Sequence, residues 1–100
     1  MTALDALSSV IEVGNCVAYA QGCGNGSATQ TIGIVTKIHQ KDPKMSPIVT
    51  IKPIERWSYK GKLVGRANPV DPGRLIVIPW ENVPDSMRMI LETVELERGE

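Results

Sequence analysis

Short runs of apolar and β-branched residues, separated by turn-forming residues at intervals of roughly ten positions, follow one another along the chain up to Pro79. Asn68 to Gly73 contains two prolines and predicts a turn. This alternation of short strands and turns is typical of an all-β barrel or sandwich. The strands are predicted at Cys16–Ala20, Thr31–Ile38, Pro47–Ile54 and Arg74–Ile78, with two more at 56–59 and 62–66 around a tight turn at Lys60–Gly61.

The segment Thr31–Ile38 does not alternate perfectly. Ile32, Ile34 and Ile38 follow a period of two, but the apolar Val35 breaks it. Because a glycine inside a strand often marks an irregularity, Gly33 suggests a β-bulge or a sharp bend.

Both ends of the chain show helical patterns. Thr2 followed by Asp5, with Leu4 and Leu7 on one side, predicts a short N-terminal helix that ends at Ser8–Ser9. Near the other end, Asp85 is expected to cap an amphipathic helix over about 85–98, which Gly99 ends.

The apolar stripe of this C-terminal helix has two interpretations. It closes the open end of the barrel, or it docks on a partner protein or on a second copy of the chain. In a homodimer, the acidic residues of the helix would pair with the basic middle of the other copy. The candidate partner-binding residues fall at i, i+3, i+4 and i+7 of the helix: Met87, Ile90, Leu91 and Val94.

Length and composition indicate a single globular domain over 1–100, with 42% apolar and 22% charged residues. The N-terminus lacks the basic start and apolar run of a signal peptide, and no apolar run approaches the ~20 residues of a membrane span. Cys16 and Cys23 are too few for a disulfide scaffold. We therefore expect a soluble cytoplasmic protein with reduced thiols and no membrane partner.

Catalytic, metal and cofactor chemistry lack their usual residue patterns. His39 is the single histidine, whereas zinc sites normally combine paired cysteines with further ligands. The glycines at 22, 24 and 26 lack the Lys-Ser/Thr of a phosphate loop and precede a predicted strand, which favours a plain hairpin loop. We expect no enzyme activity, no metal site and no cofactor.

The formal net charge is zero, but the charges are unevenly distributed. From Lys37 to Arg74, nine basic residues stand against three acidic ones, a net charge of +6. Residues 1–36 carry −2 and residues 75–100 carry −4. Neutrality is therefore a cancellation between segments, and a basic nucleic-acid interface remains compatible with it.

Two aromatic residues lie inside this basic segment, at Trp57 and Tyr59. Two positions apart on a strand, they share one face. Aromatic rings among lysines and arginines are typical of single-stranded nucleic-acid or nucleotide binding. The alternative is that both rings fill a small core that contains no phenylalanine. The candidate nucleic-acid-binding residues are Lys52, Arg56, Trp57, Tyr59, Lys60, Lys62 and Arg66.

Three short motifs resemble the SH3-like and KOW-like barrels. Residues 13–19 (Val-Gly-Asn-Cys-Val-Ala-Tyr) are similar to the turn and strand that open these barrels, although the family usually has Gly-Asp there. Residues 33–38 resemble their second strand, and residues 74–83 their last strand with the short helical turn after it. The resemblance covers about 13–83 and implies an SH3-like barrel of five to six strands; Pro53–Pro72 exceeds a minimal barrel and suggests a long central hairpin. In size and texture the chain also resembles small proteins of tailed bacteriophages.

Barrels of this kind are mostly binding modules. We therefore expect a non-enzymatic, phage-encoded protein that binds nucleic acid or nucleotide through its basic central segment in the host cytoplasm. The alternative is an adaptor or inhibitor that docks on a host protein, such as a transcription or defence component. A homodimer is compatible with either.

Overall fold

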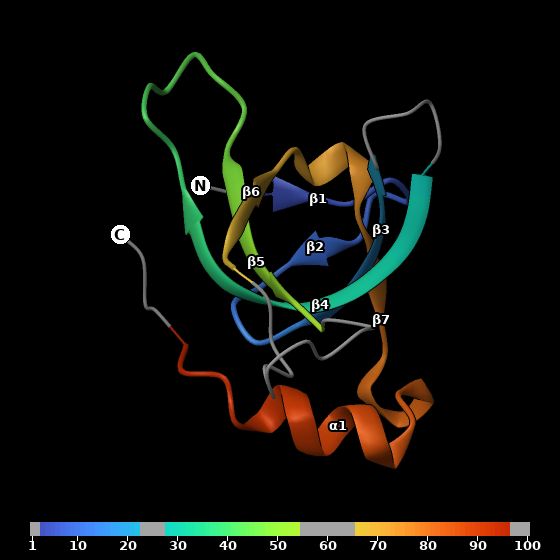
Figure 1. The fold of residues 1–100 in the computed structure, drawn as a ribbon. Coiled ribbons are helices and arrows are strands. Elements are labelled where there is room, and N and C mark those ends of the chain that lie inside the picture. Colours follow the sequence, from blue (N-terminus) through green and yellow to red (C-terminus); the bar gives the residue numbers. More distant parts are fainter. Residues whose placement is uncertain (1–2, 23–27, 55–65, 97–100) are drawn as a thin grey trace.

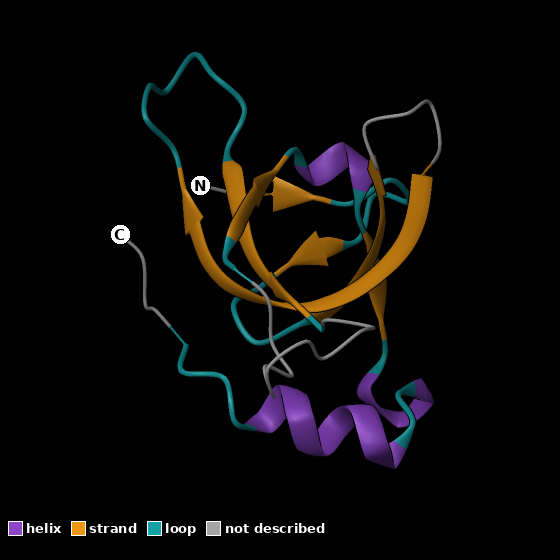
Figure 2. Ribbon diagram, viewed as in Figure 1, coloured by secondary structure: helices purple, strands orange, loops and turns teal. Residues whose placement is uncertain are grey.

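A computed structural model describes residues 3–22, 28–54 and 66–96. These residues are predominantly β, which confirms the all-β class, and one α-helix follows the last strand (Figures 1 and 2). Two short 3₁₀ turns, Pro72–Arg74 and Trp80–Asn82, flank that strand. The elements are β1 (Ala3–Leu4), β2 (Val10–Ile11), β3 (Cys16–Gly22), β4 (Ala28–His39), β5 (Ile48–Pro53), β6 (Asn68–Val70), β7 (Ile76–Ile78) and α1 (Asp85–Glu92).

Five strands form one antiparallel sheet in the order β6-β5-β4-β3-β7. The long strand β4 bends strongly, so the sheet curls, and the two-stranded β1–β2 ladder lies across its concave side (Figure 1). The outermost strands β6 and β7 do not pair with each other, so within the described residues hydrogen bonding does not close the sheet. The helix α1 lies on the convex side, beneath β4.

The curled sheet has a core on each side. The inner core, on the concave side, joins the main sheet to the β1–β2 ladder. The helix core, on the convex side, joins the sheet to α1, and Trp80, Met87 and Val94 pack against it. The buried residues of the inner core are Ala3, Ile11, Val17, Tyr19, Val35, Val49, Ile51, Val70 and Leu75; those of the helix core are Cys16, Ile34, Val83 and Leu91.

The irregularity expected in β4 is present, but it lies between Val35 and Lys37 rather than at Gly33. Gly33 has a packing role instead. A Cβ atom there would lie 2.7 Å from the Lys52 carbonyl oxygen and 2.9 Å from the Pro53 Cα atom. Only a residue without a side chain lets β5 approach β4 this closely.

The predicted N-terminal helix is wrong. Residues 3–4 form β1, which pairs with β2 through Ala3 opposite Ile11 and Leu4 opposite Val10. Asp5 follows in a turn, where its side chain accepts the backbone N–H groups of Leu7 and Ser9. A helix of two turns has little stability of its own, and the extended arrangement instead buries Ala3 and Ile11 in the inner core.

The C-terminal helix is shorter than predicted. It spans Asp85–Glu92 and ends at Thr93, whose backbone N–H bonds to the carbonyls of Ile90 and Leu91, instead of running to residue 98. Asp85 is its first residue, and Pro84 precedes it without a side-chain cap. In the part of the chain that the structure describes, no helix is long and apolar enough to cross a membrane.

The predicted turn at 68–73 contains a strand, because β6 pairs with β5 through Thr50 opposite Pro69. The Ile54 N–H bonds to the Ile32 carbonyl of β4, so alternate residues of β5, including Thr50, direct their backbone groups toward β4. Pro69, opposite Thr50, therefore directs its nitrogen away from β5, where the missing N–H costs no ladder bond. The predicted strand at 56–59, the turn at Lys60–Gly61 and all but the last residue of the predicted strand at 62–66 lie outside the described residues, and Arg66 itself is not in a strand.

Both edges of the main sheet are protected against further strand pairing. At β6, Pro69 leaves the open edge without a donor at its central position. At β7, the Asp5 carboxylate accepts the Val77 N–H at 2.8 Å, and the Ala6 N–H donates to the Leu75 carbonyl at 2.8 Å. The Asp5 carboxylate thus stabilises the turn in which it lies and attaches the β1–β2 ladder to the last strand.

Candidate nucleic-acid interface

Two of the seven predicted nucleic-acid-binding residues lie within the described structure. Lys52 is a half-buried residue of β5, and Arg66 is exposed on the segment that leads to β6. The other five, in the part that the structure does not describe, are Arg56, Trp57, Tyr59, Lys60 and Lys62.

The strand register places Lys37 beside Lys52 on the convex face. In β5 the buried residues Val49, Ile51 and Pro53 alternate with half-buried Thr50 and Lys52, so the latter two point outward. Lys37 of β4 lies opposite Thr50 and is therefore a diagonal neighbour of Lys52. Such neighbours are roughly 7–8 Å apart at the backbone, within reach of one extended ligand. We call Lys37 and Lys52 the lysine pair.

The β-bulge in β4 directs Lys37 to the same face of the sheet as Lys52. Ile34 belongs to the helix core and Val35 to the inner core, so strict alternation would turn Lys37 inward. The extra residue Thr36 absorbs one position, with its hydroxyl donating to the Thr50 carbonyl at 3.3 Å. Lys37 then points outward and Ile38 packs against the inner core. The sequence signal was the broken alternation at Val35.

Charges of opposite sign lie on different parts of the described structure. Lys41 and Lys44 lie in the exposed loop between β4 and β5, and Asp42 in that loop accepts the Lys44 N–H. Acidic side chains gather instead on α1 and the residues around it. Exposed acids there are Glu81, Asp85, Glu92 and Glu95. The β4–β5 loop with its lysines lies far from α1 (Figure 1), whereas Lys37 and Lys52 share the convex side of the sheet with the helix.

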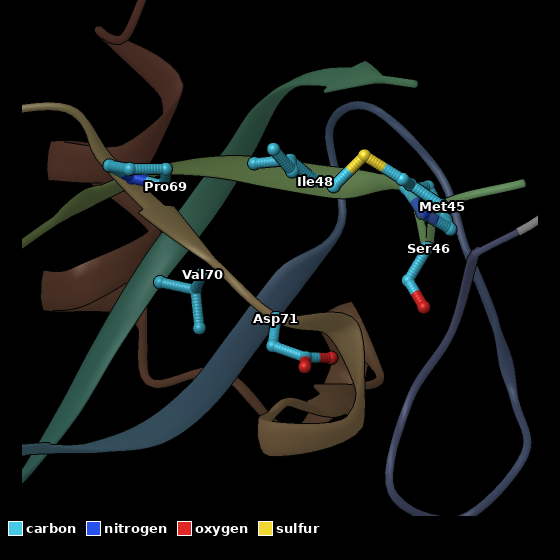
Figure 3. Close-up of a pocket in the computed structure, with 7 residues that line it drawn as sticks. Met45, Ser46, Ile48, Pro69, Val70 and Asp71 are labelled. Atoms are coloured by element: carbon cyan, nitrogen blue, oxygen red, sulfur yellow. The ribbon is translucent and has the colours of Figure 1, made fainter. Parts of the chain in front are cut away.

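A shallow apolar pocket of about 460 Å³ lies where β5 begins and β6 ends (Figure 3). The side chains of Met45, Ile48 and Pro69 follow one another along it, with Ser46 and Asp71 among its polar lining residues. Met45 is 57% exposed. Ile48 lies opposite His39 of β4, so the pocket adjoins the strand that carries Lys37.

Tyr19 is the aromatic residue of the described β-strands, but it does not offer a stacking surface. It is buried in the inner core. Burial raises the pKa of its phenol, while the neighbouring Asn68 side chain and Arg74 guanidinium act to lower it. The hydroxyl itself makes no hydrogen bond within the described residues. Arg74 is engaged elsewhere, since its guanidinium donates to the Ala20 carbonyl at 2.8 Å.

Most of the predicted partner-binding stripe on α1 packs on the chain's own sheet. Leu91 is 0% exposed, and Met87 and Val94 pack against the same helix core. Leu91 therefore has no surface to offer a partner, because the sheet already covers it. Ile90 is half-buried, and the large apolar residue that α1 exposes to solvent is Met89, at 71% exposure.

The convex side also holds Trp80 and Cys16. Trp80 packs against the helix core, and its indole N–H donates to the Gly14 carbonyl at 3.2 Å. Burial raises the pKa of the Cys16 thiol to about 11, so it is protonated and unreactive at neutral pH. Among the residues that the structure describes, no cluster of three or more His, Cys, Asp or Glu side chains is placed to hold a metal ion.

Comparison of the chain with protein-family models, with curated proteins and with solved structures finds no match.

Proposed function

We propose that this chain is a non-enzymatic binding protein with an SH3-like barrel, and that it binds nucleic acid or nucleotide through its basic central segment. The barrel is supported by the curl of the main sheet and by the β1–β2 ladder on its concave side (Figure 1). The inner core connects the two sheets, as a barrel interior would.

The lysine pair is the observation that carries the binding proposal. Lys37 and Lys52 lie on neighbouring strands with their side chains directed to the convex face, where both are half-buried. Two ammonium groups at this spacing suit successive phosphates of an extended polynucleotide, which they attract by releasing condensed counterions. The remaining candidates, from Arg56 onward, follow Lys52 closely in the sequence.

Fluorescence anisotropy with labelled single-stranded RNA, single-stranded DNA and duplex DNA tests this proposal over a salt series of about 50 to 300 mM. We expect binding that weakens steeply with salt. The double variant Lys37→Gln/Lys52→Gln should lower the slope of log K against log salt by about 1.4 for a single strand, or about 0.7 for each lost contact. Absent or salt-independent binding to all three probes, and to free nucleotides, contradicts the function.

The matched control is Lys41→Gln/Lys44→Gln in the β4–β5 loop, which removes the same net charge. We expect it to change the slope by less than the lysine-pair variant does. Equal losses in the two variants would show that total charge drives binding, which would contradict the lysine pair as the site while leaving nucleic-acid binding intact.

The second candidate function is a protein-interaction adaptor or inhibitor that docks on a host protein. It is favoured by the exposed methionines Met45, at the pocket, and Met89, on α1. Methionine side chains adapt to varied apolar partners. Capture of a protein from host lysate that survives nuclease treatment but is lost in Met45→Asp or Met89→Asp would favour this function over the first.

A further inference from the structure

The shallow pocket where β5 begins and β6 ends lies beside the lysine pair on the same face of the sheet. Lys37 of β4 lies opposite Thr50 of β5, and Thr50 lies opposite Pro69 of β6, which lines the pocket. Residues opposite each other on neighbouring strands direct their side chains to one face. With strands about 4.8 Å apart, the backbones at Lys37 and Pro69 are about 10 Å apart. A polynucleotide bound at the lysine pair therefore passes the pocket.

The pocket combines an apolar side with a polar one. The side chains of Met45, Ile48 and Pro69 follow one another along the first, and the Ser46 hydroxyl and the Asp71 carboxylate lie on the second (Figure 3). Its volume of about 460 Å³ is typical of sites for small molecules. Proteins hold an unstacked nucleobase in the same way, with apolar side chains against its faces and hydrogen bonds to its edge.

The Asp71 carboxylate offers a hydrogen-bond acceptor to a ligand in the pocket. Its Oδ1 accepts the Gly73 N–H at 3.0 Å, which holds the side chain at the start of the 3₁₀ turn Pro72–Arg74. Within the described residues its other oxygen, Oδ2, makes no hydrogen bond. An ionised carboxylate accepts hydrogen bonds and cannot donate them, so the ligand has to bring the donors. The same negative charge repels phosphate, which leaves the phosphates of a polynucleotide to the lysine pair.

The charges around the pocket suit a polyanion. Within three residues of its lining along the chain lie three basic side chains, Lys44, Arg66 and Arg74, and one acidic side chain, Asp42, all exposed. The surroundings of the pocket therefore attract negative charge, whereas Asp71 in its lining requires hydrogen-bond donors. A nucleotide within a polynucleotide meets both conditions, because its phosphate is anionic and its base carries N–H groups.

We propose that the pocket is a nucleobase subsite of the nucleic-acid interface, and that Asp71 makes it selective for guanine. Guanine carries two adjacent donors, its ring N–H and its amino group, on the Watson–Crick edge, and a carboxylate accepts both. Adenine and cytosine have a ring acceptor beside the amino group, and uracil has its ring N–H between two carbonyls, so each of them directs lone pairs toward Asp71. The inference rests on the proposed nucleic-acid binding and adds base selectivity to it.

Fluorescence anisotropy with uracil-only RNA oligomers that differ at one central position tests the inference, at a salt concentration of about 0.1 M. Guanine at that position should bind at least about fivefold more tightly than adenine, the lower end of the discrimination that a bidentate contact provides. Hypoxanthine, which is guanine without its amino group, should lose most of this advantage. In Asp71→Asn the guanine preference should fall below about twofold, because the amide keeps one oxygen for Gly73 but replaces the second acceptor with a donor.

The matched control is Asp42→Asn in the β4–β5 loop. Asp42 is also exposed, and its carboxylate also accepts a neighbouring N–H, that of Lys44 at 2.9 Å, so the variant removes the same charge from a similar turn. It should leave the guanine preference unchanged. Met45→Ser removes part of the apolar side without touching the carboxylate and should also lower the preference. Circular dichroism of all three variants shows whether each keeps the fold.

Binding with a guanine preference below about twofold in the unmodified protein would overturn the inference and leave nucleic-acid binding intact. A preference that persists in Asp71→Asn, or falls equally in Asp42→Asn, would overturn it as well. Absence of binding to every oligomer would contradict the proposed function, and the inference with it. If Met45→Ser abolished capture of a host protein that survives nuclease treatment, without any guanine preference in the unmodified protein, the pocket would belong to a protein contact instead.

Discussion

The elements that cover the inner core and the helix core are attached to the main sheet by different interactions. The inner core is covered by a two-stranded ladder held to β7 by one carboxylate, which accepts three backbone N–H groups. The helix core is covered by α1, which packs through apolar side chains, while Arg88 donates to the carbonyls of Trp80 and Val83. Acid should therefore weaken the first attachment and leave the second unchanged, because arginine does not titrate in this range.

Replacing Leu91 with alanine should have the largest effect on stability. The side chain is fully buried in the helix core, so its loss leaves a cavity and removes apolar contacts. We expect the free energy of unfolding to fall by about 2–5 kcal/mol. Urea denaturation measures this change, with Met89→Ala on the exposed side of α1 as a control that should cost less than about 0.5 kcal/mol.

Asp5→Asn should have the next largest effect, on the inner core. The amide keeps one oxygen but replaces the other with an N–H₂ group, which cannot accept the N–H groups that face it. Hydrogen bonds to a charged group contribute about 1.5–3 kcal/mol, and we expect a loss of this size in urea denaturation. Amide hydrogen exchange should speed up at Val77 first. Unchanged exchange there would show that the carboxylate does not hold β7.

The dependence of stability on pH should separate the two cores. Burial raises the pKa of Asp5, but the N–H groups of Val77, Ser9 and Leu7 together lower it, and the pKa lies below the ordinary value of 3.8. This contribution to stability is therefore complete above that ordinary value and is lost as the pH falls through the lower folded-state pKa. The free energy of unfolding, measured from neutral to strongly acidic pH, should depend less on pH in Asp5→Asn than in the unmodified protein. In Leu91→Ala it should be lower at every pH but change with pH as it does in the unmodified protein.

Trp80→Phe should have a smaller effect, confined to the helix core. Phenylalanine keeps much of the packing but loses the indole N–H that donates to the Gly14 carbonyl. We expect a loss of about 0.5–1.5 kcal/mol, the net contribution of one hydrogen bond. A much larger loss would indicate that the size of the indole ring, and not its hydrogen bond, holds α1 near the Gly14 turn.

Replacing the lysine pair should have almost no effect on stability. Lys37 and Lys52 are half-buried on the convex face and are not among the fully buried residues of either core, so Lys37→Gln/Lys52→Gln should change the free energy of unfolding by less than about 0.5 kcal/mol. The same variant should weaken nucleic-acid binding, as proposed above. A loss of stability comparable to that of Asp5→Asn would instead assign these lysines a structural role.

Local pattern was enough to predict most of the sheet. The strands at β3, β4, β5 and β7 could be found because side chains on neighbouring positions point to opposite faces, a property of the strand itself. The irregularity in β4 was also detectable, because the adjacent apolar residues Ile34 and Val35 point to opposite faces and break the alternation of a strand with one apolar face. The register of β4 against β5, which makes Lys37 a neighbour of Lys52, could not be read from either segment by itself.

The candidate sites were harder to predict than the strands. The stripe Met87, Ile90, Leu91 and Val94 was found by its helical spacing, but spacing cannot say which surface covers it. The structure shows that the sheet of the same chain covers Leu91. The exposure of Leu4, Leu7 and Val10 was not predicted, because Leu4 and Leu7 fitted one side of a short helix and Val10 was assigned to the next segment.

The sequence by itself determined the all-β class, the approximate places of the main strands, the C-terminal helix and the separation of charge along the chain. Tertiary structure decided the conformation of the N-terminal residues, the outward direction of Lys37 and the side on which α1 packs. The physical reason is the range of the interactions. Strand and helix patterns arise between near neighbours, whereas the Asp5 carboxylate accepts the N–H of Val77, 72 residues further along the chain. No local pattern contains that contact.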